Sequence, residues 1–231
     1  MDLFLQPLLT LPYWGQAVVA LVFAYLFGAI PFSFMVGKLF FRINLLKEGS
    51  GNLGAANSFR TLGAKAGISI LLLDMAKGAI AVFFARFVVT VSGMDIAWGN
   101  WLLVACALAA IIGHTASPYI KFRGGKGAAS SAGVMFALVP IVFVISAIVF
   151  VSTIALTRYV SVGTIVTAVA FPVWVAIFYP NVPFILFAAV IAVIVPIFHR
   201  ANIKRLRAGT EPRFAWRNRG QGLRRKGVSA D

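Results

Sequence analysis

The sequence is poor in charged residues, in histidine and in cysteine. Its 231 residues include six acidic side chains, two histidines and one cysteine, and only 12% of them are charged. The single Cys106 excludes a disulfide within the chain, and so few, scattered carboxylates and histidines predict no metal site. A soluble domain carries roughly twice this share of charge. The composition therefore argues against a soluble protein.

Long apolar runs make up much of the chain instead. Hydrophobic residues account for 61% of the sequence and stand in unbroken runs. This pattern predicts an all-α polytopic membrane protein. The fourth run is longer than one crossing needs, and Pro140 lies inside it, so two short helices are predicted there, at about 128–139 and 141–157. The apolar runs cover roughly residues 13–41, 68–91, 98–116, 128–157, 160–178 and 181–198.

The cations lie at alternate ends of these runs. Residues 1–12, 92–97 and 179–183 contain no Lys or Arg. Because Lys and Arg are retained on the cytoplasmic side, the pattern predicts seven transmembrane helices, with the N-terminus outside and the C-terminus in the cytoplasm. The alternative is five spans with a re-entrant segment at residues 128–157. Nearly all cations lie in residues 42–65, 117–127, 157–161 and 200–231.

The net charge of +15 would suggest nucleic-acid binding in a soluble protein. Here the positive-inside pattern accounts for most of it, so no nucleic-acid partner is predicted. Residues 1–206 are predicted to form one integral-membrane domain, and residues 207–231 a basic, flexible cytoplasmic tail attracted to anionic lipid. The N-terminus lacks the basic segment and the small-residue cleavage site of a secretory signal, so the first span is expected to remain as an anchor.

A glycine-rich basic stretch at residues 113–127 separates two of the apolar runs. Glycine lets backbone N–H groups come close to a ligand, and a helix that begins after Gly127 presents free N–H groups beside Lys126 and Arg123. This combination is typical of a phosphate site at the membrane surface; the alternative is that Lys121, Arg123 and Lys126 are only cations at the lipid surface. The stretch lacks the spacing, and the Ser or Thr after lysine, of a nucleotide-binding P-loop. His114 is either a general base or a satisfied interfacial histidine.

A second loop of small residues lies at residues 49–60. Its Gly-Ser-Gly-Asn-Leu-Gly formally matches a dinucleotide-binding fingerprint, but no strand precedes it, so the match fails on context. The loop is then either a polar turn or a binding loop. Its polar side chains are Ser50, Asn52, Asn57 and Arg60.

Three further polar groups interrupt or end apolar runs. Asp74 and Lys77 share a helix face and form either a structural ion pair or a pair in which Asp74 orients Lys77 toward a substrate. Ser161 either caps the helix that follows or holds a phosphate together with nearby backbone N–H groups. The basic segment at residues 199–205 either only ends the last span or belongs to a site.

Taken in order, these motifs resemble a known family. They read Gly-Ser-Gly-Asn-x-Gly-Ala-x-Asn-x-x-Arg, Asp-x-x-Lys-Gly, Gly-His-x-x-Ser-Pro with Lys-Phe-x-Gly-Gly-Lys-Gly, Ser-Val-Gly, and His-Arg-x-Asn-Ile-Lys-Arg-Leu with Gly-Thr-Glu. Over residues 20–212 the sequence is similar to the bacterial glycerol-3-phosphate acyltransferases that use acyl phosphate, the PlsY type. The resemblance implies an enzyme of the bacterial plasma membrane with its active site at the cytoplasmic face.

The implied reaction moves a fatty acyl group from acyl phosphate to the 1-hydroxyl of sn-glycerol 3-phosphate, giving lysophosphatidic acid and phosphate. The expected partners are these two substrates and membrane lipid, with no cofactor. Acyl phosphate is already activated, so positioning and electrostatic stabilisation suffice without a covalent intermediate. The hydroxyl proton passes either to a substrate phosphate oxygen or to His199. The competing functions are a transporter of organic phosphate and a phosphatidyl-group transferase.

The resemblance and the motifs together give a set of expected site residues. The expected catalytic residues are His199, Asn202, Lys126 and Ser161. The sequence departs from the family at Ala56, where threonine is usual. The expected substrate-binding residues are Ser50, Asn52, Asn57, Arg60, Lys77, Arg123, Gly124, Gly125, Gly127, Gly163 and Arg205.

Overall fold

The computed structural model describes residues 2–214, and within this range the regular elements are helices. Residues 215–231, most of the predicted tail, lie outside the described residues. The helices are α1 (Asp2–Leu9), α2 (Tyr13–Gly28), α3 (Phe32–Phe41), α4 (Ala55–Leu62), α5 (Ala64–Val91), α6 (Ile96–Thr115), α7 (Ala128–Leu138), α8 (Pro140–Thr157), α9 (Val160–Phe178), α10 (Val182–Phe198) and α11 (Arg200–Arg207).

Five segments among the described residues are long and apolar enough to cross a membrane. A sixth span results if α10 and α11, which meet at a bend of 55°, are counted as one. The prediction of an all-helical protein with several membrane spans is therefore confirmed. The predicted total of seven also needs the 11-residue α7 as a span. The five segments are Tyr13–Phe41, Ala64–Val91, Ile96–Thr115, Pro140–Thr157 and Val160–Phe178.

Proline and glycine set the helix boundaries. The long run at 128–157 is divided as predicted, because Pro140 lacks a backbone N–H and begins α8 at the position where none is needed. Pro31 likewise separates α2 from α3. Helix α4 was not predicted; it occupies part of the expected loop, and Gly54 and Gly63 bound it at its two ends. The short helices α1 and α11 were not predicted either.

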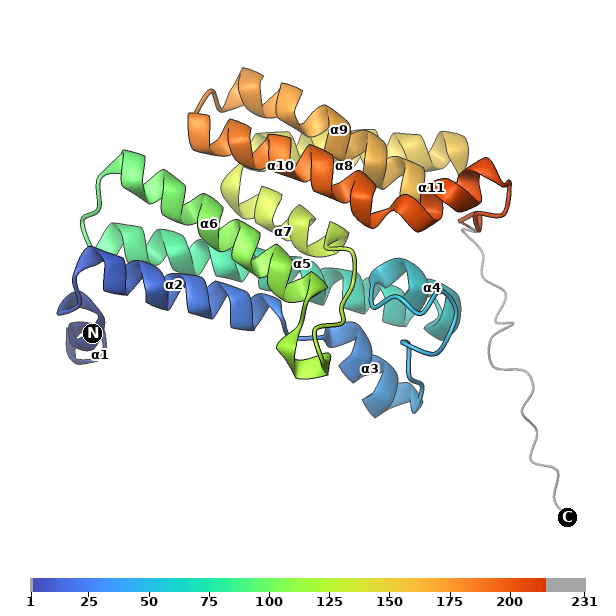
Figure 1. Ribbon diagram of the computed structural model, residues 1–231, viewed down its shortest axis with the longest axis horizontal. Helices are drawn as coiled ribbons and strands as arrows, with labels where there is room; N and C mark the ends of the chain where they lie inside the picture. The colour runs from blue at the N-terminus through green and yellow to red at the C-terminus, as the bar shows by residue number, and fades with distance from the viewer. Residues whose placement is uncertain (1, 215–231) are drawn as a thin grey trace, which may run out of the picture.

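The helices form two layers with α7 between them (Figure 1). Helices α2, α5 and α6 pack together in one layer, and α8, α9 and α10 form the other. Helix α7 packs most extensively on α5, because small residues let the two backbones approach closely. A Cβ atom added to Gly78 would strike the backbone of Ser130, and one added to Gly133 would strike that of Met75.

The C-terminal end of α7 is fixed from α5. The Arg86 side chain donates a hydrogen bond of 3.0 Å to the carbonyl oxygen of Ala137, in the last turn of α7. A cation at this end complements the helix dipole and satisfies a carbonyl that has no partner within the helix. The short α7 is thereby held both at this end and along α5.

Candidate active site

A cavity of about 390 Å³ lies between the two layers. It runs from α4, α11 and the N-terminal ends of α7 and α9 into the apolar space between α7, α8, α9 and α10. One end is rich in polar groups, whereas Ala, Met, Phe, Ile and Val side chains dominate the rest. The polar end is lined by Ser50, Asn52, Asn57, Arg60, Lys126, Ser161, His199, Asn202, Arg205 and Glu211.

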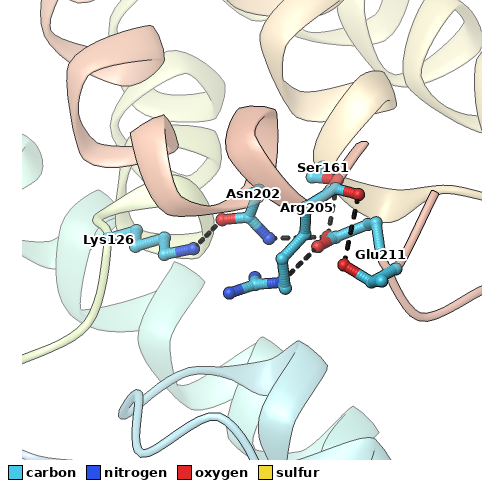
Figure 2. Close-up of polar contacts among 6 residues, drawn as sticks. Lys126, Ser161, Asn202, Arg205 and Glu211 are labelled. Carbon is cyan, nitrogen blue, oxygen red and sulfur yellow. Dashed lines mark hydrogen bonds and ion pairs between the residues drawn. The ribbon is translucent and has the colours of Figure 1, made fainter. Parts of the chain in front are cut away.

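Glu211 joins the polar groups on the C-terminal side of the cavity. Its Oε1 accepts hydrogen bonds from Ser161 Oγ at 2.8 Å and from Asn202 Nδ2 at 2.6 Å. Its Oε2 pairs with Arg205 Nε at 2.7 Å (Figure 2). Burial alone would raise the pKa of this carboxyl, but the three donors outweigh burial and lower the pKa below its usual value. Glu211 is therefore a buried anion that fixes three expected site residues in one arrangement.

Sequence reasoning missed Glu211, although the signal was present. It is the only acidic residue between Asp95 and Asp231, and it stands in a strongly basic segment. It is also the last residue of the Gly-Thr-Glu motif that follows α11. A lone carboxylate among cations that are themselves near a site is a candidate to orient them. Glu211 falls within residues 207–231, which the sequence predicted as a flexible tail, and it was not among the expected site residues.

Lys126 approaches the same group from the opposite side. Its Nζ donates to Asn202 Oδ1, so one amide connects the lysine to Glu211 (Figure 2). Between Lys126 and the start of α7, the chain turns at Gly127, whose φ of 79° lies in the left-handed region that favours glycine. Burial, with the nearby Arg205 in second place, lowers the pKa of Lys126 to about 8. A cation that is short of anionic partners beside a helix N-terminus is suited to bind phosphate.

His199 lies at the bend between α10 and α11 and is buried. Its Nδ1 lies 2.8 Å from the carbonyl oxygen of Val195, which can only accept, so Nδ1 carries the proton and Nε2 is left as an acceptor. Burial lowers the pKa of His199 to about 4, and the positive charge of Lys126 acts in the same direction. His199 is therefore neutral near pH 7 and a weak base, which favours a substrate phosphate oxygen as the proton acceptor.

The loop before α4 is organised by Asn57. Its Oδ1 accepts from the Ser50 backbone N–H at 2.9 Å, and its Nδ2 donates to the carbonyl oxygens of Glu48 and Asn52, both at 3.1 Å. Asn57 is 2% exposed, so it holds the loop in shape. Ser50, Asn52 and Arg60 carry side chains at the cavity wall. Ala56 lines the cavity too, and its methyl group stands where a threonine would add a hydroxyl.

Several expected site residues do not reach this cavity. Of the glycine-rich stretch at residues 113–127, His114 and Lys126 line it. Gly124 and Gly125 pack on His114, since a Cβ atom on either would strike the backbone or ring of that histidine. Gly163 packs against α8, and Ser161 lies inside α9 rather than capping it, because the cap is Tyr159. The residues away from the cavity are Lys77, Arg123, Gly124, Gly125, Gly127 and Gly163.

Lys77 forms an ion pair within the protein. Its Nζ lies 2.9 Å from Asp74 Oδ1 and donates to the carbonyl oxygen of Ile30 at 2.7 Å, in the break between α2 and α3. Both charged side chains are 1% exposed. His114 Nδ1 lies 3.6 Å from the same Asp74 oxygen. This geometry is that of the structural ion pair, the first of the two alternatives for Asp74 and Lys77.

Lys77→Met should therefore act on stability. Removing one partner of a buried ion pair leaves the other uncompensated, which typically costs about 3 to 5 kcal/mol. We expect a correspondingly lower thermal unfolding midpoint for Lys77→Met in detergent. The double variant Asp74→Asn/Lys77→Met removes both charges and should regain part of the loss. Equal stability of wild type and the single variant would contradict the structural role and return Lys77 to the substrate-binding candidates.

Comparison with known proteins gives one consistent result. The sequence profile of the family described as glycerol-3-phosphate acyltransferase matches residues 18–209. A protein of that name from Macrococcus caseolyticus is 41% identical over 202 residues, which cover 87% of this chain and 99% of the relative. A Listeria monocytogenes protein of the same name is 40% identical and covers 84% of this chain and 94% of its own length.

Two solved structures are similar as well. Both are crystal structures of PlsY (YgiH), described as an integral membrane glycerol 3-phosphate acyltransferase. The glycerol 3-phosphate form has a TM-score of 0.79 and 36% sequence identity, and covers 87% of this chain and 96% of that structure. The lysophosphatidic acid form has a TM-score of 0.76 and 35% identity over the same shares.

Proposed function

The chain belongs to the glycerol-3-phosphate acyltransferase family, and from that membership we propose a complete reaction for its cavity. The protein is a membrane-embedded enzyme that acylates glycerol 3-phosphate to lysophosphatidic acid. In the proposed reaction the donor is acyl phosphate, and the acyl group moves to the 1-hydroxyl. The hydroxyl oxygen forms an ester bond to the acyl carbon, the bond from that carbon to the phosphate oxygen breaks, and the hydroxyl proton goes to a phosphate oxygen.

One observation carries the proposal. A single cavity joins a cation-lined end to an apolar shaft between α7, α8, α9 and α10. Both proposed substrates have a phosphate, and only the donor has a long apolar chain. The polar end therefore fits two phosphates, and the shaft fits one acyl chain. A transporter of organic phosphate would need the cations but not the shaft.

The polar residues take the following proposed roles. Lys126, Arg60 and Arg205 bind phosphate and neutralise the charge that develops as phosphate leaves. Ser161 and Asn202 are held by Glu211 at the junction between the polar end and the shaft, where hydrogen-bond donors orient the reacting groups. The predicted residues that lie away from the cavity support the segments around it from behind; they are Lys77, Arg123, Gly124, Gly125, Gly127 and Gly163.

We further propose seven spans in a bacterial plasma membrane, with the N-terminus outside and the site in the cytoplasm. The cation distribution along the sequence supports this orientation. Single cysteines can test it in a Cys106→Ser background, with an impermeant maleimide on sealed right-side-out vesicles. Pro180→Cys, at an exposed turn, should react at once, whereas Lys47→Cys should react only after the vesicles are opened. Reaction of both in sealed vesicles would overturn the orientation.

The donor can be tested with purified protein in detergent. With acyl phosphate and glycerol 3-phosphate, the enzyme should release lysophosphatidic acid and inorganic phosphate in equal amounts, without a sealed compartment. The same assay with acyl-coenzyme A should give no product. If product formed with acyl-coenzyme A and not with acyl phosphate, the assignment of acyl phosphate as donor would be wrong. The acylation of glycerol 3-phosphate itself would still stand. Phosphate movement only in sealed vesicles, with no ester formed, would favour the transporter.

The lowered pKa of Lys126 predicts a fall of activity in mild alkali. The lysine is a cation below its pKa of about 8 and loses that charge as the pH rises through this value. The kcat/KM for glycerol 3-phosphate should therefore fall about tenfold per pH unit above this point, since kcat/KM reports the free enzyme. Lys126→Arg keeps its charge at every accessible pH, so its residual activity should lack this limb. The same limb in both proteins would assign it to another group.

A further inference from the structure

We propose that the deep end of the cavity limits the length of the acyl chain, and that Phe171 is its main stop. The inference rests on the proposed acyl-phosphate donor and adds the residues that select among donors. It concerns the apolar shaft, where none of the phosphate-binding groups lies. The side chains that line this shaft become larger toward its deep end, and buried core residues pack behind them.

Helix α9 shows the change of size most directly. Its lining positions include Ser161 at the polar end, Thr164 and Ala168 farther along, and then Phe171. These positions share one helix face, because they recur at intervals of three or four. Phe171 lies ten positions after Ser161, which corresponds to about 15 Å at the rise of an α-helix. The part of the wall that α9 contributes is therefore built of small side chains for this depth and then ends in an aromatic ring.

Helix α7 shows the same change. Ala128 and Ala132 line the cavity in its first turns, and Met135 follows at the deep end. Helix α10 enters from the opposite direction, and its deepest lining residue is Ile191. Phe143 of α8 also lines the cavity. The large side chains of Phe171, Met135 and Ile191 lie in its deep part on three other helices. Each of the three is at most 7% exposed.

The stop is rigid because it is packed from behind. The Phe171 ring contacts the Phe187 ring of α10 edge to face, with centroids 6.0 Å apart. Beyond this level Leu138, Val139 and Val142 are at most 2% exposed and do not line the cavity. An acyl chain long enough to reach past Phe171 would have to displace close-packed core residues, and this costs free energy. The same carbons have no such cost in lipid. Longer donors should therefore bind less well in the reactive position.

Two variants that change the depth in opposite directions test this proposal. Phe171→Ala deepens the shaft, and Ala168→Leu fills it above the stop. The measurement is kcat/KM for a series of saturated acyl phosphates from eight to twenty carbons. Relative to wild type, we expect Phe171→Ala to raise the ratio of long to short donors at least tenfold, and Ala168→Leu to lower it at least tenfold. A single methylene in a fitted pocket is worth roughly 10- to 200-fold.

Phe184→Ala serves as the matched control. Phe184 lies on α10 and is 9% exposed, but it does not line the cavity. Its truncation should lower stability without moving the length profile. If Phe171→Ala does not fold, Phe171→Leu and Ala168→Leu carry the same test with smaller changes of volume.

The outcomes separate this inference from the proposed function. A wild type that uses acyl phosphates, with unchanged length profiles in Phe171→Ala and Ala168→Leu, would overturn the stop. That result would mean that the chain leaves the cavity between helices into the bilayer. An equal loss for all chain lengths in Ala168→Leu would also overturn it. A wild type without activity on any acyl phosphate would overturn the proposed donor and this inference with it.

Discussion

Lys126→Met should lower kcat/KM for glycerol 3-phosphate about a thousandfold in the acyl phosphate assay. Methionine keeps the length and apolar stem of lysine but removes the only cation that the glycine-rich loop places in the cavity. Removing one preorganised group that stabilises developing charge typically costs about 10²- to 10³-fold. The loss should be at the upper end, because Lys126 also donates to Asn202 and so completes the chain of contacts to Glu211.

Two companion variants separate charge from general damage. Lys121→Met removes an exposed cation from the same loop that does not line the cavity, and it should retain nearly full activity. Lys126→Arg keeps the charge in a bulkier form and should recover part of the rate. A Lys126→Met enzyme within tenfold of wild type, with an intact unfolding midpoint, would remove Lys126 from the proposed catalytic residues.

The membrane architecture was predictable because it depends on local properties of the chain. Apolar runs and the position of Pro140 predicted the long helices and the division between α7 and α8, which the structure contains. The amphipathic helices α4 and α11 were harder to predict, since each has only eight residues and contains several polar ones. Their helical form depends on packing at the ends of the spans, which no short window of sequence reveals.

The sequence predicted which segments belong to the site better than it predicted the directions in which their side chains point. Motifs identified which segments carry polar groups, and the cavity brings together side chains from residues 49–60, 113–127, 161 and 199–205. Spacing alone did not tell which side of a loop each residue faces. Gly124 and Gly125 pack on His114, and Lys77 pairs with Asp74, because tertiary contacts decide these directions. The sequence marks Glu211 as a lone carboxylate in a basic segment, but its three partners, Ser161, Asn202 and Arg205, are set by the fold.

The arrangement around Glu211 explains how a cation-rich site stays ordered. Arg60, Lys126 and Arg205 all line the cavity, and like charges at close range repel. One buried carboxylate pairs directly with Arg205 and reaches Lys126 through Asn202. The site thus contains fewer anions than cations until a substrate phosphate arrives. The remaining positive charge is what favours binding of phosphate over the empty state.

Glu211→Gln should lower kcat/KM about a hundredfold, which corresponds to roughly 2.7 kcal/mol of transition-state stabilisation. Three donors converge on the carboxylate, from Ser161, Asn202 and Arg205. Glutamine offers one acceptor oxygen and turns an N–H₂ group toward at least one of these donors, which leaves a buried donor without a partner. The expected damage is therefore misplacement of Ser161 and Asn202, with the phosphate-binding cations still present.

Kinetics can distinguish this effect from a loss of binding charge. Misplaced reacting groups should reduce kcat more than they raise KM, whereas removal of an anion from a cationic site would by itself tighten phosphate binding.

In wild type, activity should also fall as acid protonates Glu211, at a pH below the usual range for a glutamate because its pKa is lowered. Glu211→Gln should lack that acid limb. Thr210→Ala, a change at the exposed neighbouring residue, should leave both parameters unchanged. A Glu211→Gln enzyme with wild-type kcat would show that Ser161 and Asn202 reach their working positions without the carboxylate.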